Sequence, residues 1–242
     1  MWVVVPAYDE ASRITATLDA LAAQTDRDFV LAVVDNGSLD GTPELVRRFA
    51  ARAPFPVRLL HEPQKGVGAA VDTGIRHAIA HGAAYIARTD ADALPRPGWV
   101  AAARAGLDGG AALACGRLVA RRDEHGPGGR AGFALLVFLA TAFGRLRPAH
   151  RGPEFLAPYR MHAGNNMAVT AALYLRCGGM PRRPSPTDRE FLNRVRRHTA
   201  AVVRCRGMVV ENSTRRLRAY GVLGTARWYL DRGSDGLTPD PR

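Results

Sequence analysis

Residues 2–38 have the sequence WVVVPAYDEASRITATLDALAAQTDRDFVLAVVDNGS, which predicts a strand, a helix and a second strand. The apolar run 2–5 indicates a buried strand that ends at Pro6, and the run 29–34 indicates the second strand. Between them, residues 10–24 place their large apolar side chains on one helical face. The chain therefore begins with a strand–helix–strand unit.

The same alternation continues along the first third of the chain. It predicts helices at 42–53 and 66–80 and strands at 57–60 and 84–87. Repeated strand–helix units imply right-handed crossovers, and hence an α/β fold with a mainly parallel sheet flanked by helices. Such sheets bind ligands at the carboxyl ends of their strands, and polar clusters follow the first, second and fourth strands here.

The second half of the chain is less regular. We interpret the apolar run 131–143 as a buried or interfacial helix, with burial favoured, because about 20 residues are needed to span a bilayer. The chain is expected to be one domain over 1–232 with a flexible tail (233–242). The remaining expected elements are strands at 113–119, 201–203 and 208–210, helices at 171–177 and 188–198, and a polar loop at 121–130.

Composition limits the classes of protein to consider. The 34 basic and 22 acidic residues give a formal net charge of +12, and 47% of the residues are hydrophobic, as in globular proteins. Cys115, Cys177 and Cys205 are odd in number and widely spaced, which excludes a disulfide scaffold or zinc ribbon and fits a reducing compartment. A strand pattern follows Met1 at once and leaves no room for a signal peptide, so we expect a cytoplasmic protein.

The strongest chemical cluster is Thr89-Asp90-Ala91-Asp92, directly after a predicted buried strand. Two carboxylates at this spacing can bind different groups: one can bind a divalent cation and the other can accept a hydrogen bond from a sugar hydroxyl. Mg²⁺ and Mn²⁺ prefer such oxygen ligands and leave positions open for a diphosphate. The alternative is a solvated turn, in which aspartate is common.

Three further clusters favour a nucleotide at the same edge of the sheet. Backbone amides of residues 6–10, together with Tyr8, can face a nucleotide, and Asp35 can accept the imide N–H of a uracil-type base. Residues 65–68 (KGVG) open a helix, which suits an anion and a lysine point charge, although they do not form the dinucleotide fingerprint. The alternatives are an acidic helix start for residues 6–10 and a tight turn after Asp35.

Taken together, these motifs resemble the family 2 glycosyltransferases, which have the GT-A fold. The resemblance runs in order over nearly the whole chain, from about Trp2 to Arg216. The motifs that carry it are PAYDE (6–10), DNGSLDGT (35–42, with Asn36 in place of the usual second acidic residue), QKGVGAAVDTGI (64–75), TDADALP (89–95), GNNMAVT (164–170) and STRR (213–216).

The resemblance implies a role for each matching residue. In inverting members the Asp of a late Glu-Asp pair is the general base, and the matching position here is Asp188, with Thr187 in place of the Glu. Asp92 would bind the metal. The nucleotide-binding half would be residues 1–92 and the acceptor half residues 93–232. The other implied residues are Pro6, Ala7, Tyr8, Glu10, Asp35, Lys65, Gly68, Asp90 and Arg216 for the donor nucleotide, and Gly164, Asn165 and Asn166 for the acceptor side.

The expected function is transfer of a sugar from a UDP-, GDP- or dTDP-sugar to an acceptor hydroxyl, with inversion and with Mg²⁺ or Mn²⁺. A close alternative is a membrane-associated enzyme that acts on a lipid-phosphate acceptor, peripheral at the inner membrane face, through its arginines and the run 131–143. A nucleotidyltransferase is less favoured, because residues 6–10 supply no Gly-rich phosphate loop. The hypothesis of a non-catalytic nucleic-acid-binding protein is supported only by the net positive charge, and no nucleic-acid partner is expected.

Overall fold

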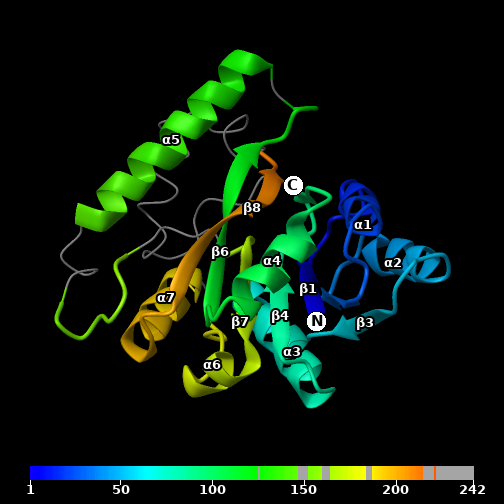
Figure 1. Ribbon diagram of the computed structural model, residues 1–242. Coiled ribbons are helices and arrows are strands. Elements are labelled where there is room, and N and C mark those ends of the chain that lie inside the picture. Colours follow the sequence, from blue (N-terminus) through cyan, green and yellow to red (C-terminus); the bar gives the residue numbers. More distant parts are fainter. Residues whose placement is uncertain (125, 147–151, 160–163, 184–186, 215–220, 222–242) are drawn as a thin grey trace.

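The computed structural model describes residues 1–124, 126–146, 152–159, 164–183, 187–214 and 221. In them, one eight-stranded sheet carries helices on both faces (Figure 1). The strands, in sheet order, are β3 (Val57–His61), β2 (Val30–Asp35), β1 (Trp2–Ala7), β4 (Tyr85–Arg88), β7 (Met167–Thr170), β6 (Leu113–Ala120), β8 (Val202–Asn212) and β5 (Leu94–Pro95). Strands β3, β2, β1 and β4 are mutually parallel, as are β6 and β8, while β7 and β5 are antiparallel to their neighbours. The predicted α/β class with a mainly parallel sheet is confirmed.

Period-two alternation sends successive side chains of β1 into two separate cores. Val3 and Val5 pack with one set of helices, and Trp2 and Val4 pack with the other. The first set is α1 (Ile14–Ala22), α2 (Thr42–Ala50) and α4 (Trp99–Asp108); the second is α3 (Val67–Ala80), α6 (Ala171–Arg176) and α7 (Thr187–His198). Burial of each valine stabilises the fold by about 1.5–3 kcal/mol. The unbroken run of valines therefore indicates a strand covered on both faces.

The first strand continues through Pro6 to Ala7, so the predicted end at Pro6 is wrong. The Val4 carbonyl faces β4 and accepts the amide hydrogen of Thr89. The backbone nitrogen of Pro6, two residues further on, faces the same side of β1. Pairing of β1 with β4 stops at Val4, so the missing N–H of Pro6 falls where no neighbouring strand needs it. Proline is thus compatible with a central strand at this position.

A single strand, β8, replaces the two short strands predicted at 201–203 and 208–210. Arg204 and Arg206 are exposed and polar, so they interrupt the apolar pattern between the two predicted strands. The sheet absorbs the irregular stretch by a register shift, in which Cys115 pairs with Arg204 but Arg117 pairs with Val209. The short strands β5 and β7 and the helix α4 were not predicted.

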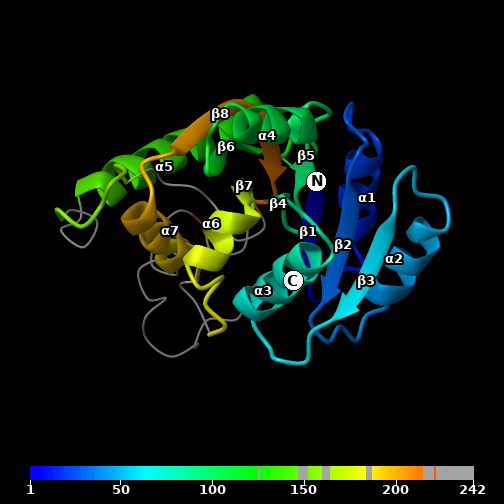
Figure 2. The same ribbon diagram turned by 60° about the horizontal axis from the view of Figure 1, so that its bottom comes forward.

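Helix α5 (Pro127–Leu146) is longer and more exposed than predicted. It begins inside the expected polar loop, and Leu135, Phe138 and Leu139 are 58%, 67% and 53% exposed, so the predicted burial is wrong. Figures 1 and 2 place α5 on the side of the molecule opposite α1 and α2. Within the described residues, no helix combines the length and apolarity needed to cross a membrane.

Candidate active site

The carboxyl ends of β2, β1 and β4 lie side by side, because these strands are parallel neighbours in the sheet. The loops that follow them contain the predicted nucleotide and metal motifs, which are thereby brought to one edge. Pro6 and Ala7 are buried residues of β1, and the Ala7 carbonyl accepts the amide of Asn36 at 2.9 Å. Pro6 and Ala7 therefore lie beneath the loops that form the candidate site.

Hydrogen bonds fasten the loop after β1 to the loop after β2. The amide of Asp9 donates to Ser38 Oγ at 3.0 Å, and the amide of Glu10 donates to Thr42 Oγ1 at 2.9 Å. Asp9 has a φ of 51°, in the left-handed region that residues other than glycine seldom adopt. The loop that carries Tyr8 and the buried Glu10 is therefore held in one shape before any ligand binds.

Lys65 connects three of the predicted donor motifs. Its Nζ donates to the carbonyls of Asn36 and Gly37 at 2.9 and 3.0 Å, and lies 3.7 Å from the centroid of the Tyr8 ring. A cation over an aromatic face is attracted by the ring electrons. The only lysine of the chain thus sits among the loops that resemble the nucleotide motifs.

The departure at Asn36 has a structural reason. Its side-chain nitrogen donates to the carbonyls of Glu62 and Gln64, each at 2.8 Å, and its Oδ1 accepts the amide of Gly66 at 2.8 Å. An ionised carboxylate cannot donate, so aspartate could not make the first two bonds. The neighbouring Asp35 accepts the amides of residues 37 and 38 and fixes the turn.

Gly68 lies where α3 approaches the start of α7. A Cβ at Gly68 would lie 2.2 Å from the Pro181 carbonyl oxygen and 2.7 Å from Thr187 Cγ2. Thr187 is buried, so a compact side chain in place of the family's Glu fits this packed junction. The absence of a side chain at Gly68 is therefore required by packing, and its predicted contact with a phosphate stays a prediction.

A buried arginine joins the two carboxylates that the sequence assigned to opposite sides of the site. Arg88, the last residue of β4, donates through Nη1 to Asp188 Oδ1 at 2.7 Å and through Nη2 to Asp90 Oδ1 at 3.2 Å. Its side chain is only 3% exposed. The predicted base and the first aspartate of the strand-end motif are thus neighbours, although they lie about a hundred residues apart in the chain.

Electrostatics at this junction favours an additional positive charge. Withdrawal from water, with a further contribution from the negative charges of Asp92 and Asp188, raises the pKa of Asp90 to about 6, although Arg88 acts in the opposite direction. Burial alone would lower the pKa of Arg88, but Asp188 and Asp90 hold it above its ordinary value, so the arginine stays charged. A bound cation would favour the ionised form of the aspartates.

The donor set fits Mg²⁺ or Mn²⁺ bound together with a diphosphate. In the part of the chain that the structure describes, no group of three or more His, Cys, Asp or Glu side chains could enclose a metal. Mg²⁺ is commonly held by one or two carboxylates with phosphate oxygens and water as the other ligands. Asp92, the predicted metal ligand, can supply that share. Arg121 donates to the main-chain carbonyl of Asp92 at 3.3 Å, and so supports the turn itself.

The predicted acceptor-side residues differ in what they contact. A Cβ at Gly164 would lie 2.0 Å from Asp188 Cγ, so the carboxylate occupies the space that a side chain would fill. Asn165 is buried, and its Oδ1 has no hydrogen-bond partner among the described residues. Asn166 is fully buried and bonds the Trp99 indole and the carbonyls of Arg117 and Met208. Gly164 thus adjoins Asp188, Asn165 donates to Asn212 at the end of β8, and Asn166 serves the interior.

Sequence reasoning missed Arg88 and Arg121. Arginine is abundant in this chain, so neither residue stood out. One available signal was the position of Arg88, a charged residue ending a short apolar strand two residues before Asp90. Arg216, predicted to meet the diphosphate, lies outside the described residues.

The comparisons with known proteins agree with the motifs. The model of "Glycosyl transferase family 2" matches residues 2–170, well over half of the chain. The chain belongs to this family. The resemblance drawn from the motifs and the predicted class of enzyme, a glycosyltransferase, are thereby confirmed.

Two relatives illustrate the similarities of this family 2 chain. It is 36% identical over 100 residues to glycosyltransferase AglE of Haloferax volcanii, covering 40% of this chain and 32% of the relative. It is 30% identical over 128 residues to polyprenol monophosphomannose synthase of Mycolicibacterium smegmatis, covering 52% of this chain and 46% of the relative. The matched segments thus span less than half of either relative.

A solved structure supports the same fold. The mannosyltransferase PcManGT of Pyrobaculum calidifontis, in complex with GDP-Man and Mn²⁺, superposes with a TM-score of 0.66 at 26% identity. The match covers 99% of this chain and 66% of that chain. The predicted GT-A architecture, a single sheet flanked by helices, is confirmed.

Proposed function

We propose that this chain transfers a sugar from a nucleoside diphosphate sugar to an acceptor hydroxyl, with inversion at the anomeric carbon and with a divalent cation. The observation that carries the proposal is the meeting of Asp90, Arg88 and Asp188 at the carboxyl ends of the parallel strands. It places a helix-start carboxylate beside the strand-end motif that suits a metal-bound diphosphate. The solved mannosyltransferase, with its GDP-Man and Mn²⁺, supports the choice of donor class and metal.

In the proposed reaction, Asp188 takes the proton of the acceptor hydroxyl as that oxygen attacks the anomeric carbon. The bond from the anomeric carbon to the phosphate oxygen breaks, and the nucleoside diphosphate leaves with the electron pair. When bound, Mg²⁺ or Mn²⁺ supplies Lewis-acid stabilisation of the leaving diphosphate, and Asp92 would hold it. Asp90 would bond the ribose, Asp35 the base, and Lys65 would add positive charge near the phosphates.

Two features support this division of roles. Asp188 lies in the first turn of α7, where the helix dipole favours the ionised form of a carboxylate. Asp35 ends β2 and Lys65 follows β3, on the nucleotide-binding half (1–92) that we propose, whereas Asp188 belongs to the acceptor half (93–232). Attack from the acceptor side, opposite the departing diphosphate, is the geometry that inversion requires.

A thermal-unfolding screen of UDP-, GDP- and dTDP-sugars with and without Mn²⁺ tests the proposal. A donor at about 100 times its Kd stabilises the native state by about 2.7 kcal/mol. We expect one nucleotide class to raise the melting temperature, and to raise it further with Mn²⁺. If no nucleotide sugar stabilises the protein under either condition, the proposed donor class is wrong.

Substitution of Gly164 should disturb the base without touching the donor. In Gly164→Ala, the new Cβ would lie 2.0 Å from Asp188 Cγ, so the carboxylate has to move. A displacement of about 1 Å can cost about 10²-fold in rate, and we expect a loss of kcat of that size with unchanged donor affinity. Gly128→Ala is the matched control, because a Cβ there meets no atom within 4 Å. Full activity of Gly164→Ala would contradict the placement of Asp188.

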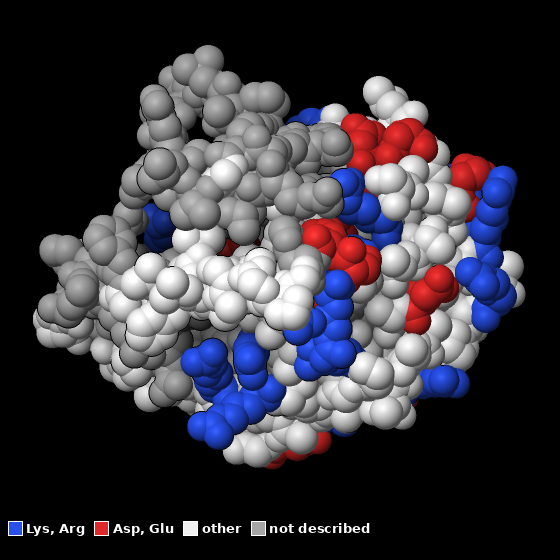
Figure 3. Space-filling view, turned by 90° about the horizontal axis from the view of Figure 1, so that it is seen from above, with Lys and Arg blue, Asp and Glu red and all other residues white. Residues whose placement is uncertain are grey.

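A second candidate function, transfer to a lipid-phosphate acceptor at a membrane surface, is favoured by helix α5. The exposed side chains of Leu135, Phe138 and Leu139 recur at helical spacing, and the helix contains no acidic residue. Figure 3 shows an uncharged ridge on this face of the molecule, with a group of basic side chains beside it. This combination suits an anionic bilayer, where apolar side chains insert and arginines meet headgroups.

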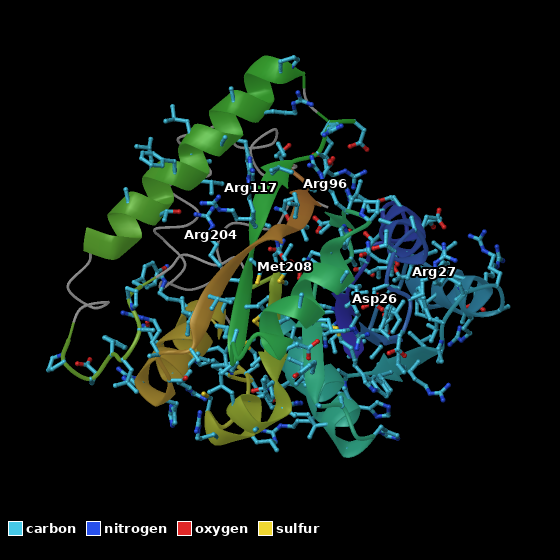
Figure 4. The ribbon with its side chains drawn as sticks, in the orientation of Figure 1. Asp26, Arg27, Arg96, Arg117, Arg204 and Met208 are labelled. Carbon is cyan, nitrogen blue, oxygen red and sulfur yellow. The ribbon has the colours of Figure 1, made fainter. Side chains whose placement is uncertain are left out.

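The basic side chains near α5 come from the adjoining strands. Arg117 lies on β6 and Arg204 on β8, beside α5 in the view of Figure 4. Together with Arg206, they are exposed and make no ion pair among the described residues. Each basic residue near an anionic surface contributes about 1 kcal/mol to binding. The similarity to polyprenol monophosphomannose synthase supports the same acceptor class.

Vesicle sedimentation distinguishes this candidate from an enzyme acting on soluble acceptors. We expect the protein to sediment with vesicles of anionic phospholipid more than with neutral ones, and less at high salt. Phe138→Ser should weaken binding, whereas Leu175→Ser, which removes a 51%-exposed leucine on α6, should not. Equal loss in both variants, or no binding at all, would count against a membrane role for α5.

A further inference from the structure

The Arg88 side chain ties the donor side of the site to the acceptor side. Its two Nη atoms bond separate carboxylates, Asp90 in the turn after β4 and Asp188 at the start of α7. The guanidinium is planar and its donors have a fixed fork, so two bonds to two partners set their relative position. Arg88 is buried, whereas the two aspartates keep 33% and 37% of their side-chain surface exposed. The two aspartates thus face solvent and ligands, while the Arg88 guanidinium that links them is shielded from water.

Asp188 is confined from a second direction. The carboxylate lies against the main chain of Gly164, in the space where a Cβ would stand. A side chain held by a charge-assisted hydrogen bond on one side and by main chain on the other has little rotational freedom. Its position therefore depends on Arg88 as much as on the helix that carries it.

The hydrogen bonding of Arg88 is incomplete in a way that stability alone does not explain. Its buried Nε has no hydrogen-bond partner among the described residues. A buried donor without a partner costs free energy, and native proteins tolerate few of them. Where a protein keeps such a group, the site is commonly functional, because function and local stability compete there. In Arg88, both Nη atoms are hydrogen-bonded to the aspartates of the site, whereas Nε is left without a partner among the described residues.

We propose that Arg88 is a positioning residue that fixes the candidate base, Asp188, relative to the donor-side aspartate, Asp90; this inference rests on the proposed function. It acts through Asp188 rather than on the substrate. Arg88 is therefore required for turnover much more than for donor binding. A lysine can replace its charge but cannot hold two carboxylates with a fixed fork.

A double-mutant cycle tests the proposal. We expect Arg88→Lys to lower kcat by about 10²-fold, with the donor KM changed less than about threefold. In the Asp188→Asn background, the same substitution should cost less than about threefold, because the residue through which it acts is already disabled. Arg104→Lys is the matched control. Arg104 bonds Asp26 at 2.7 Å outside the site, and its substitution should leave kcat unchanged.

Amide hydrogen exchange gives a readout that needs no turnover. Arg88→Lys should speed exchange at the start of α7, residues 187–192, while Arg104→Lys should not. Equal fractional loss of kcat in the two backgrounds, or wild-type activity and exchange in Arg88→Lys, would overturn the role of Arg88. Failure of the wild-type protein to turn over any nucleotide sugar would instead overturn the proposed function, and the exchange comparison would still test the tie.

Discussion

Replacement of Asp188 by asparagine is expected to lower kcat by 10²–10⁴-fold, the usual range for loss of a general base. The amide keeps the size of the side chain and can still accept a bond from Arg88, but it cannot take the acceptor proton. The donor KM should stay near the wild-type value, because Asp188 lies on the acceptor side of the Arg88 bridge. Steady-state assays with varied donor and saturating acceptor measure both constants.

Glu190 provides the internal control for this prediction. It lies two residues further along α7, about 200° around the helix, and its carboxylate bonds Arg183 and Arg194 rather than Arg88. Glu190→Gln should therefore leave kcat nearly unchanged. If Glu190→Gln is damaging and Asp188→Asn is mild, the base is misassigned. If neither substitution matters, proton removal does not limit turnover or the reaction retains configuration, which the anomeric configuration of the product decides.

The parallel part of the fold was predictable because its signals are local. Valines in β1 and β2 alternate between two cores, and turn residues follow each strand at once, so both the strands and the edge where their loops meet follow from sequence. Tyr8, Asp35 and Lys65 were predicted as donor residues on that basis, and the structure brings them to neighbouring loops. Their binding of a nucleotide remains a prediction.

Contacts between distant segments were not predictable in the same way. The bridge from Arg88 to Asp188 and the packing of Gly68 against Thr187 depend on where α7 docks, and no local pattern encodes that. Burial of α5 was predicted from its apolar composition, but composition does not reveal whether a partner surface exists. In this chain α5 packs against β6 along one side and leaves Phe138 exposed.

Replacement of Asp92 by alanine is expected to abolish metal-dependent turnover while leaving the fold intact. Of the predicted site residues, Asp92 is the one we assign to the metal, and no group of three or more potential metal ligands among the described residues could take its place. The Arg121 bond to the main chain of residue 92 survives the substitution, so the turn should keep its shape. The melting temperature without ligand should thus stay close to that of the wild type.

Two measurements separate loss of the metal from general damage at this turn. In Asp92→Ala, Mn²⁺ should no longer increase the thermal stabilisation given by a nucleotide sugar, although the wild-type protein shows that increase. Asp123→Ala is the matched control, because Asp123 is a half-exposed partner of the same Arg121, and it should keep the Mn²⁺ effect. Full wild-type activity in excess EDTA, or undiminished turnover in Asp92→Ala, would remove the cation from the mechanism. The positive charge of Lys65 and the neighbouring arginines would then have to stabilise the leaving diphosphate alone.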